Sequence, residues 1–302
     1  MKILITGAGG FVGKRLSQYL AEKGHKVVAI VRSIPVDIEC SQGAARNRNI
    51  EFLKVDLNSL NCSRLPSDID AIYTLAQSAH FRDFPKKAED VFAVNIEANF
   101  QLLQWAIGAG VRKFIHISSG GIYGGKLGKI FQEDDSLAVD SPLGFYLGSK
   151  LCSEIIFQNY RSFFETAVIL RPFFIYGPDQ QRDMFISRLI DGVRRGSPLQ
   201  LQGKNGLKVN PIFVNDAVVA FANALDLSGF HIINIAGPDV LHLRQIGEII
   251  GEAVGKQPVF EKKEGTPVDY VANTEQAVRK LQQPLTSFEE GISLTVGIDE
   301  QR

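Results

Sequence analysis

Tyr146 and Lys150 stand four residues apart in a stretch with helical spacing, and together they could move a proton. Residues i and i+4 of a helix share one face, so the ammonium group would lie beside the phenol. A tyrosine has an ordinary pKa of about 10, and a neighbouring positive charge stabilises the phenolate and lowers that pKa. Such a pair can donate a proton to a carbonyl oxygen or accept one from an alcohol. That chemistry is useful where a hydride also moves, which requires a redox cofactor.

A glycine-rich stretch at the start of the chain could bind this cofactor. Gly7, Gly10 and Gly13 follow an apolar run typical of a buried strand and precede a segment with helical spacing. Gly7 would allow a tight turn, Gly10 a close approach of the backbone to a pyrophosphate, and Gly13 close packing of the helix on the strand. The pyrophosphate would then face the N-terminus of the helix that begins near Phe11 and Val12.

Composition indicates a protein that acts on small molecules. The chain has 302 residues, of which 45% are hydrophobic, enough for one large and one small domain. Lys plus Arg and Asp plus Glu both number 33, so the formal net charge is zero. Neither nucleic acid nor an anionic membrane is therefore an expected partner. No apolar run approaches the roughly 20 residues that a membrane helix needs.

The cysteines and histidines give no sign of a metal site. Cys40, Cys62 and Cys152 lack metal-ligand spacing, and the five histidines are scattered without an HExxH motif. The amino terminus has the pattern of a buried strand, which differs from that of a secretory signal peptide. The sequence predicts a cytoplasmic protein with reduced thiols and no bound metal.

Seven strand-like apolar runs alternate with helical patterns, which is typical of a parallel sheet covered on both faces. The runs are Lys2 to Thr6, Lys26 to Val31, Ile50 to Lys54, Ala71 to Leu75, Lys113 to Ser118, Ala167 to Leu170 and His231 to Ile235. Long helices are expected over 91–107 and 184–195, and an irregular loop over 126–143. The predicted fold class is α/β, a Rossmann-type doubly wound sheet with a smaller C-terminal α/β substrate domain. Residues 1–170 and 212–236 would form the dinucleotide-binding domain, and residues 171–211 and 237–302 the substrate-binding domain.

The order of these motifs resembles the extended short-chain dehydrogenases/reductases, the NAD-dependent epimerase/dehydratase family. TGAGGFVG is similar to the family's glycine-rich loop, HISSGGIYG to its catalytic-serine strand, FYLGSK to its tyrosine and lysine pair, and LRPFFIYGP to its turn into the substrate domain. Asp56 resembles the acidic residue beside the adenine, and Asn95 the family's helix asparagine. The resemblance implies an enzyme that modifies nucleotide-linked sugars.

The resemblance also implies roles for particular residues. Tyr146 would exchange a proton with a sugar hydroxyl or ketone, while Lys150 would lower its pKa and hydrogen-bond the nicotinamide ribose. Ser119, supported by Ser118, would hydrogen-bond the reacting oxygen. The cofactor-binding residues would be Gly7, Gly10, Phe11, Val12, Gly13, Arg32, Ser33, Asp56, Leu57, Leu75, Ala76, Asn95, Tyr146, Lys150 and Pro172. The substrate-binding residues would be His80, Arg82, Ser119, Gly120, Tyr146 and Lys208.

Two departures from the family pattern narrow the chemistry. Sugar-nucleotide 4,6-dehydratases carry an Asp-Glu pair where this chain has Gly120 and Gly121, so elimination of water is disfavoured. NAD-preferring relatives usually have an acidic residue near the end of the second strand, where this chain has Val31, followed by Arg32 and Ser33. Arg32 and Ser33 could bind a 2′-phosphate, so NADP is slightly favoured over NAD, although Arg32 could also stack on adenine or face solvent.

The sequence gives weaker signals for the substrate-binding residues than for the cofactor-binding residues. Lys208 stands where nucleotide-sugar relatives often have an arginine that binds the diphosphate, and it could supply the charge without a bidentate grip. His80 and Arg82 could contact substrate or lie in an ordinary exposed loop.

Several functions therefore remain open. The leading prediction is a 4-ketoreductase of a nucleotide-linked 4-keto sugar, followed by a nucleotide-sugar 4-epimerase with tightly bound NAD. A reductase of a non-sugar carbonyl and a non-enzymatic dinucleotide-binding regulator are further alternatives. The helices near Val91 to Ile107 and Gly148 to Phe164 resemble those that pair in family dimers, which predicts a homodimer.

Overall fold

The computed structural model describes residues 1–34, 48–139 and 143–300, so Cys40 lies outside the described residues. Contacts between residues divide the chain into two compact units. The first contains Met1–Ile122, Ala138–Arg171 and Phe221–Ile233, and the second contains Tyr123–Leu137, Pro172–Ala220 and Asn234–Arg302. The chain thus passes between the units several times.

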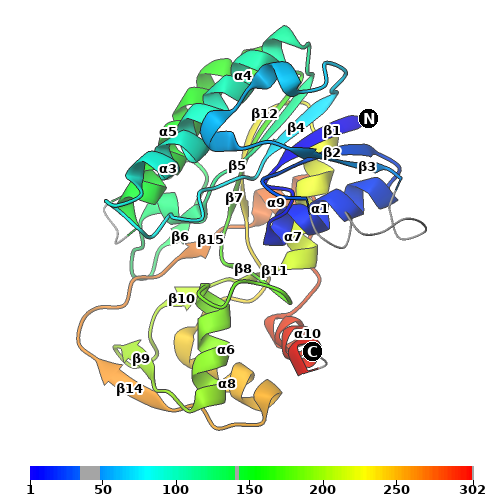
Figure 1. The fold of residues 1–302 in the computed structure, drawn as a ribbon. Helices are drawn as coiled ribbons and strands as arrows, with labels where there is room; N and C mark the ends of the chain where they lie inside the picture. Colours follow the sequence, from blue (N-terminus) through cyan, green and yellow to red (C-terminus); the bar gives the residue numbers. More distant parts are fainter. Residues whose placement is uncertain (35–47, 140–142, 301–302) are drawn as a thin grey trace. The chain divides into compact units, whose positions relative to one another are not determined.

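A seven-stranded sheet forms the centre of the first unit (Figure 1). In spatial order its strands are β3 (Ile50–Lys54), β2 (Lys26–Val31), β1 (Lys2–Thr6), β4 (Ala71–Thr74), β5 (Lys113–Ile117), β7 (Thr166–Pro172) and β12 (Gly229–Ile235). The adjacent pairs from β3 to β7 are parallel. All seven strands coincide with predicted runs to within two residues at either end, and the Rossmann-type α/β class is confirmed.

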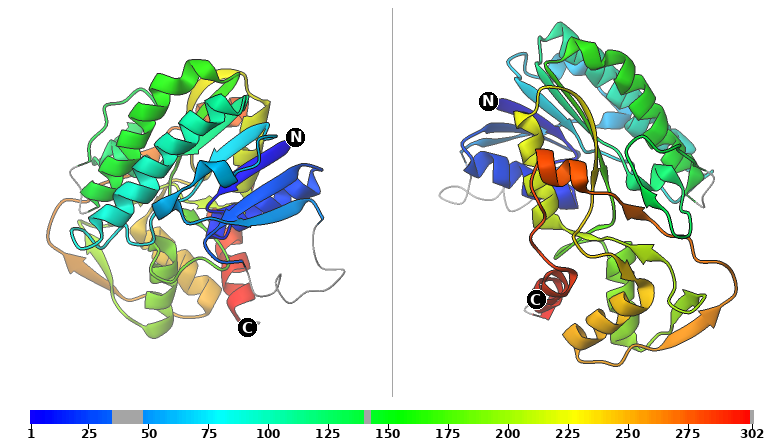
Figure 2. Two further views of the ribbon diagram at one scale, coloured as in Figure 1. Left: turned by 45° about the horizontal axis from the view of Figure 1, so that its top comes forward. Right: turned by 180° about the vertical axis from the view of Figure 1, so that it is seen from behind.

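Helices cover both faces of this sheet, as Figures 1 and 2 show. Helices α4 (Ala98–Gly108) and α5 (Gly144–Tyr160) lie side by side on one face, where Leu102 and Phe157 join the core formed by Ile72 and Phe114. Helix α1 (Phe11–Glu22) follows β1 directly and packs on the opposite face. Because the parallel strands are buried on both sides, their sequences are nearly continuous apolar runs.

The helix predicted over 91–107 is present but contains a wide turn. It begins as α3 (Ala88–Phe92), continues as a π-helical turn over Ala93–Glu97, labelled η3, and resumes as α4. Asn95 lies inside the π turn and is fully buried. Single π turns within helices occur frequently at functional sites. Apolar periodicity alone does not reveal this turn.

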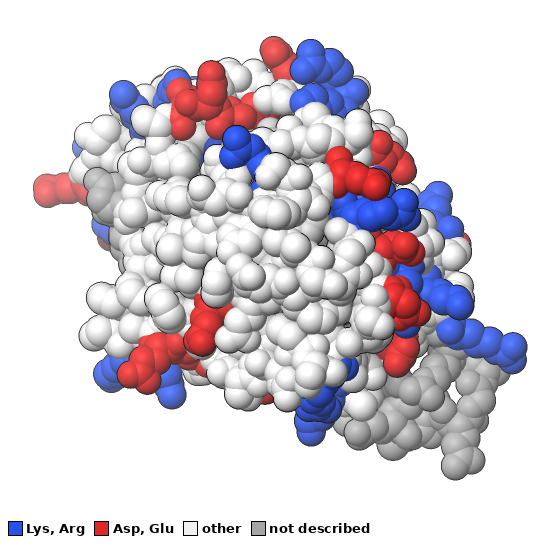
Figure 3. Space-filling model, turned by 90° about the horizontal axis from the view of Figure 1, so that it is seen from above, with Lys and Arg blue, Asp and Glu red and all other residues white. Residues whose placement is uncertain are grey.

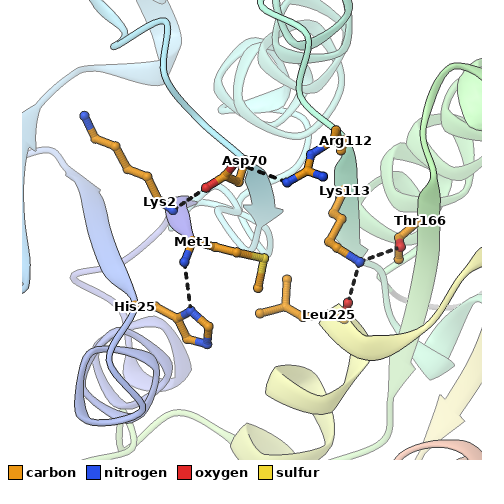
Figure 4. A network of polar contacts seen from close by, with 8 residues as sticks. All are labelled: Met1, Lys2, His25, Asp70, Arg112, Lys113, Thr166 and Leu225. Atoms are coloured by element: carbon orange, nitrogen blue, oxygen red, sulfur yellow. Dashed lines mark hydrogen bonds and ion pairs between the residues drawn. The ribbon is translucent and has the colours of Figure 1, made fainter.

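Polar contacts tie together the amino-terminal edge of the sheet (Figure 4). The main-chain N–H of Lys2 donates to a carboxylate oxygen of Asp70 at 2.8 Å, and Arg112 approaches the other oxygen at 3.5 Å. Lys113 donates to the Thr166 hydroxyl at 3.1 Å and to the Leu225 carbonyl at 2.8 Å. These contacts fix the strand ends that lie opposite the carboxyl edge, where ligands bind in folds of this type.

In its described part, the second unit contains three helices of more than ten residues, one shorter helix and short strands. Its helices are α6 (Phe185–Arg195), α8 (Leu243–Val254), α9 (Glu275–Lys280) and α10 (Phe288–Glu300); α7 (Val214–Asn223) runs across the boundary between the units. Its strands pair as β6 (Ile130–Phe131) with β15 (Val271–Ala272), β8 (Ile175–Tyr176) with β11 (Ile212–Phe213), β9 (Leu199–Gln202) with β14 (Phe260–Lys263), and β10 (Lys208–Val209) with β13 (Leu241–His242). The helix predicted over 184–195 corresponds to α6.

Short 3-10 turns connect the longer elements of the chain. They are η1 (Leu57–Ser59), η2 (Cys62–Arg64), η4 (Gly120–Tyr123), η5 (Arg161–Phe163) and η6 (Ala224–Asp226).

Residues 123–137 belong to the second unit, whereas the sequence-based division places them in the first domain. The reason is a set of distant contacts. The main-chain N–H groups of Lys126 and Gly128 donate to the carbonyl and carboxylate of Asp269 at 3.0 and 2.9 Å. The Tyr123 hydroxyl donates to Asn234 at 2.8 Å. Local sequence patterns do not indicate pairings over such separations.

Charged side chains are mixed in sign on the face that Figure 3 shows, and a broad part of that face carries none. In the described part of the chain no helix is both long and apolar enough to cross a membrane.

Candidate active site

Helix α5 presents Tyr146 and Lys150 from consecutive turns, and both side chains are buried. The Lys150 ammonium donates to the main-chain carbonyl of Ile117, the last residue of β5, at 3.0 Å. The Tyr146 hydroxyl donates to the side-chain oxygen of Gln77 at 2.9 Å and also hydrogen-bonds Ser119. The structure therefore brings Ser119, Tyr146 and Lys150 together at the carboxyl end of β5.

Burial dominates the protonation of this cluster. It raises the pKa of Tyr146 to about 12, although the hydrogen bond from Ser119 and the charge of Arg82 act in the lowering direction. Burial also lowers the pKa of Lys150 to about 8, and the carboxylate of Glu154 partly offsets this effect. The buried imidazole of His116 has its pKa lowered to about 3, first by burial and then by the charge of Lys150. Near neutral pH, Tyr146 is a proton donor beside a cationic Lys150.

The two serines differ in their surroundings. The Ser119 hydroxyl accepts a hydrogen bond from the Gly121 N–H at 3.1 Å, which orients it towards Tyr146. The Ser118 hydroxyl is buried and has no hydrogen-bond partner among the described residues. Ser119 is thus the serine that contacts Tyr146.

Gly121 cannot be replaced by a larger residue without displacing its neighbours. A Cβ atom at this position would lie 2.8 Å from a methyl group of Leu147, well inside van der Waals contact. A larger residue at 121 would therefore require the end of the Leu147 side chain to move. The site contains proton-transfer groups but lacks a carboxylate at this position for eliminating water.

The loop between β1 and α1 has the close packing that a pyrophosphate site requires. Gly7 has a φ of +71°, and a Cβ there would lie 2.8 Å from the main-chain nitrogen of Ala76. A Cβ at Gly13 would lie 2.2 Å from the Gly7 carbonyl oxygen. Helix α1 has no side-chain cap at Gly10 and no acidic residue in its first turn. Its first N–H groups can thus receive an anion, and the residues present fit a dinucleotide.

The Asn95 side chain links the segment after β4 to helix α5. Its side-chain oxygen accepts from the N–H of Ser78 at 2.9 Å, and its NH₂ group donates to the Ser149 hydroxyl at 2.9 Å. The Ser149 hydroxyl in turn donates to the carbonyl of Tyr146 at 2.6 Å. Because both ends of the amide are engaged, Asn95 holds the segment after β4 against α5. This arrangement favours a positioning role over the direct cofactor contact that the sequence predicts.

The remaining residues that the sequence predicts for cofactor or substrate binding lie on other elements than β5 and α5. Arg32 and Ser33 follow β2, and Asp56 accepts from the N–H of Asn58 at 3.0 Å as it caps the turn that begins with Leu57. Leu75 and Ala76 follow β4 and lie against the glycine loop. His80 pairs with Asp83 at 2.8 Å, and Arg82 stacks over the Phe81 ring at 4.1 Å. Pro172 and Lys208 belong to the second unit, where Lys208 begins β10.

Sequence reasoning missed Gln77 and Ser149. Gln77 directly follows the predicted Leu75-Ala76 segment, yet its contact with Tyr146 joins residues 69 positions apart. Ser149 lies between the two catalytic candidates and faces inward, with 3% of its surface exposed. Its place three residues after Tyr146 on the helix could have indicated contact with the same turn.

A Rossmann-type sheet with a glycine-rich loop and a clustered serine, tyrosine and lysine set defines a dinucleotide-dependent enzyme of the short-chain dehydrogenase/reductase type. Residues 3–236 match the model of the NAD dependent epimerase/dehydratase family, and the chain belongs to that family. The family resemblance is thereby confirmed.

Several relatives of this chain carry epimerase names, and another is a dTDP-D-glucose 4,6-dehydratase of Mus musculus. An uncharacterized UDP-glucose epimerase of Bacillus subtilis, YtcB, is 29% identical over 97% of this chain and 96% of its own. A UDP-glucuronate 4-epimerase of Thermodesulfobacterium geofontis is 26% identical over 97% of this chain and 94% of its own. The solved structure of UDP-glucuronic acid 4-epimerase from Bacillus cereus, in complex with UDP-glucuronic acid and NAD, is 28% identical with a TM-score of 0.84 and covers 100% of this chain and 99% of that one.

Proposed function

We propose that the protein interconverts the C4 epimers of a uridine-diphosphate sugar, with no net oxidation or reduction. The observation that carries this proposal is the cluster of Ser119 with the buried side chains of Tyr146 and Lys150, with glycines at 120 and 121 in place of carboxylates. The relatives above, named as UDP-glucose or UDP-glucuronate epimerases, support a sugar attached to uridine diphosphate. They favour epimerisation over the ketoreductase that the sequence placed first.

The residues of this chain can perform the acid and base steps. The glycine loop would hold a nicotinamide dinucleotide, which would supply reversible hydride transfer at C4 of the sugar and a positive charge in its oxidised form. Tyr146 takes the proton of the C4 hydroxyl as a ketone forms and gives it back when the alcohol is restored. Ser119 hydrogen-bonds the same oxygen. Lys150, as an ammonium, stabilises the phenolate that takes this proton and that forms again once the proton has been returned.

Substrate binding is proposed for His80, Arg82 and Lys208. His80 and Arg82 lie in the segment that follows β4. The positive charge of Arg82 acts to lower the pKa of Tyr146. Lys208 is proposed to supply charge to the diphosphate. Its main-chain N–H donates to Asp269 at 2.7 Å, which fixes the start of β10.

The test is an assay of the purified protein with UDP-glucose and with UDP-glucuronate, followed by separation of the sugar nucleotides. We expect conversion of one of them to its C4 epimer, with no net change in nicotinamide absorbance. The proposal is contradicted if neither sugar is converted while a 4-keto sugar nucleotide consumes reduced cofactor in stoichiometric amounts.

The 4-ketoreductase remains a second candidate because of one observation. A cavity of about 350 Å³ at the ends of β2 and β3 is lined by Arg32, Lys54, Asp56 and Arg64, a basic environment of the kind that binds phosphate. Reductive enzymes commonly draw on NADPH, and the stoichiometric consumption described above would identify this activity. The complete serine, tyrosine and lysine set, together with family membership, favours either enzyme over a non-enzymatic regulator.

A homodimer is part of the proposal. Large apolar side chains are exposed on α4, α5 and the turn that follows, including Phe100 at 42%, Ile155 at 53% and Phe163 at 61%. Phe100 and Phe163 both contact the Tyr160 ring, so these side chains form one aromatic surface. A second copy of the chain pairing through the same helices would cover it.

Phe100→Glu is expected to convert this dimer to a monomer, because it places a charge at the centre of an apolar interface. Sedimentation velocity would measure the change in mass. Leu285→Glu, at an exposed apolar residue of the second unit, should leave the mass unchanged. A monomeric unmodified protein at micromolar concentration would exclude the dimer.

A further inference from the structure

Ser78 is a buried residue at the centre of a hydrogen-bond network beside Tyr146, with 2% of its surface exposed. Its main-chain N–H donates to the Asn95 side-chain oxygen at 2.9 Å, and its hydroxyl accepts from the His80 N–H at 3.0 Å. Ser78 directly follows Gln77, whose side-chain oxygen accepts from the Tyr146 hydroxyl. The position of Gln77 against Tyr146 therefore depends on how Ser78 is held.

Asp90 accepts the hydrogen bond that the Ser78 hydroxyl donates. Asp90 lies in the first turn of α3 and is half-buried. Its other carboxylate oxygen accepts from the Asn58 side chain at 3.0 Å, and Asn58 lies in η1. An ionised carboxylate only accepts hydrogen bonds, and it does so through two oxygens. This one carboxylate thus joins three segments of the first unit: η1, the segment after β4, and α3.

The surroundings of Asp90 keep its carboxyl group ionised. Burial acts to raise the pKa of this group. The hydrogen bonds from Ser78 and Asn58, and then the charges of His80 and Arg32, outweigh burial and hold the pKa below its usual value. Hydrogen bonds to an ionised acceptor are stronger than those between neutral groups. Near neutral pH, both hydrogen bonds to Asp90 are therefore charge-assisted.

The wide turn over Ala93–Glu97 helps Asp90 and Asn95 to reach the same residue. The two side chains are five positions apart, and a regular helix of 3.6 residues per turn would point them roughly 140° apart. A π turn has more residues per turn and reduces this angle, and Asn95 lies inside it. Asp90 then binds the hydroxyl of Ser78 while Asn95 binds its N–H. The irregular turn has a use if both contacts are needed.

We propose that Asp90 is a positioning residue of the reaction, which through Ser78 holds Gln77 against the Tyr146 hydroxyl. No mechanistic role has been given to this carboxylate above, and it acts on Tyr146 through two intervening residues. Precise placement matters, because a displacement of about 1 Å can cost 10²-fold in rate. The inference rests on the proposed role of Tyr146 in proton transfer and is independent of which UDP sugar reacts.

A double-mutant cycle between Asp90 and Gln77 tests this role. Asp90→Ala should lower kcat by about tenfold in the unmodified protein and by less than about twofold in a Gln77→Ala background, because one residue acts through the other. Glu89→Ala is the matched control, since it removes the exposed neighbouring carboxylate of the same turn and should preserve kcat. Asp90→Asn keeps the size of the side chain with a single acceptor oxygen. It should lower kcat by a smaller factor, and it replaces the alanine variant if that variant does not fold.

Amide hydrogen exchange at Ser78 and His80 reports on the same segment without any sugar. Asp90→Ala should speed exchange at His80 by about tenfold, because the hydroxyl that accepts its N–H is no longer held, whereas Glu89→Ala should not. Unchanged exchange overturns the inference, as does an equal loss of kcat in both backgrounds. If the unmodified protein converts neither UDP sugar, the proposed function fails, and the exchange rates still decide whether Asp90 holds the segment.

Discussion

Tyr146→Phe is expected to lower kcat by about 10²–10⁴-fold, the usual contribution of a positioned acid or base. The substitution removes only the hydroxyl that hydrogen-bonds Gln77 and Ser119. The ring would keep its contact with Phe81, whose centroid lies 5.2 Å away. The dinucleotide should therefore bind with little change, because its proposed cradle lies in the glycine loop. Steady-state kinetics and calorimetry with the cofactor would measure the two effects separately.

Tyr73→Phe provides the control for this experiment. Tyr73 is also fully buried in the first unit, and its hydroxyl donates to the Phe221 carbonyl at 2.8 Å. Its removal should cost about 1 kcal/mol of stability and leave kcat nearly unchanged. If Tyr146→Phe kept more than about a tenth of kcat, another group would have to transfer the proton.

The contact between Tyr146 and Gln77 has a consequence for catalysis. A hydroxyl that donates to a neutral amide oxygen is held in its protonated form, which acts in the same direction as burial. Before it can take a proton from a substrate, Tyr146 must exchange this contact for one with the reacting oxygen. Gln77 is exposed and can turn away. We therefore propose that Gln77 positions the Tyr146 hydroxyl before substrate binds.

The sequence predicted the sheet well because each strand is buried on both faces. Val27, Val28 and Ala29, for example, belong to an uninterrupted apolar run bounded by polar residues, and β2 coincides with that run. The spacing of Tyr146 and Lys150 predicted a shared helix face for the same local reason. The π turn around Asn95 was not predicted, because it depends on contacts with Ser78 and with the side chains of α5.

The short strands of the second unit could not be predicted in this way. Several are two residues long, and β6 pairs with β15 across a separation of more than a hundred residues. Such strands carry no periodic pattern, and their partners are set by packing of the whole unit. The basic cavity has a similar origin, since Arg32 was identified from sequence but Lys54 and Arg64 join it only through the β2–β3 register and the turn of η2.

Glu154→Leu is expected to destabilise the protein by about 3–5 kcal/mol, because it removes the carboxylate that neutralises the buried guanidinium of Arg171. Arg171 donates to both carboxylate oxygens of Glu154, at 2.8 and 3.1 Å, and the two side chains are 3% and 0% exposed. The pair joins α5 to β7, the strand beside β5. Urea denaturation would measure the loss. The double variant Glu154→Leu/Arg171→Met should recover most of it, since neither charge then remains buried alone.

The same carboxylate affects the active site, since Glu154 lies one turn after Lys150 and its charge raises the pKa of that lysine. Burial holds this pKa at about 8, below the ordinary value of 10.5. In the unmodified protein the unfolded chain thus binds more protons between these values, and the contribution of Lys150 to stability rises with pH across that window. Activity should instead fall as pH rises through about 8, because the ammonium beside Tyr146 is lost. In the double variant the pKa of Lys150 decreases further, so the alkaline limb of kcat/KM should move to lower pH. An unchanged alkaline limb in a folded double variant would show that Lys150 does not control it.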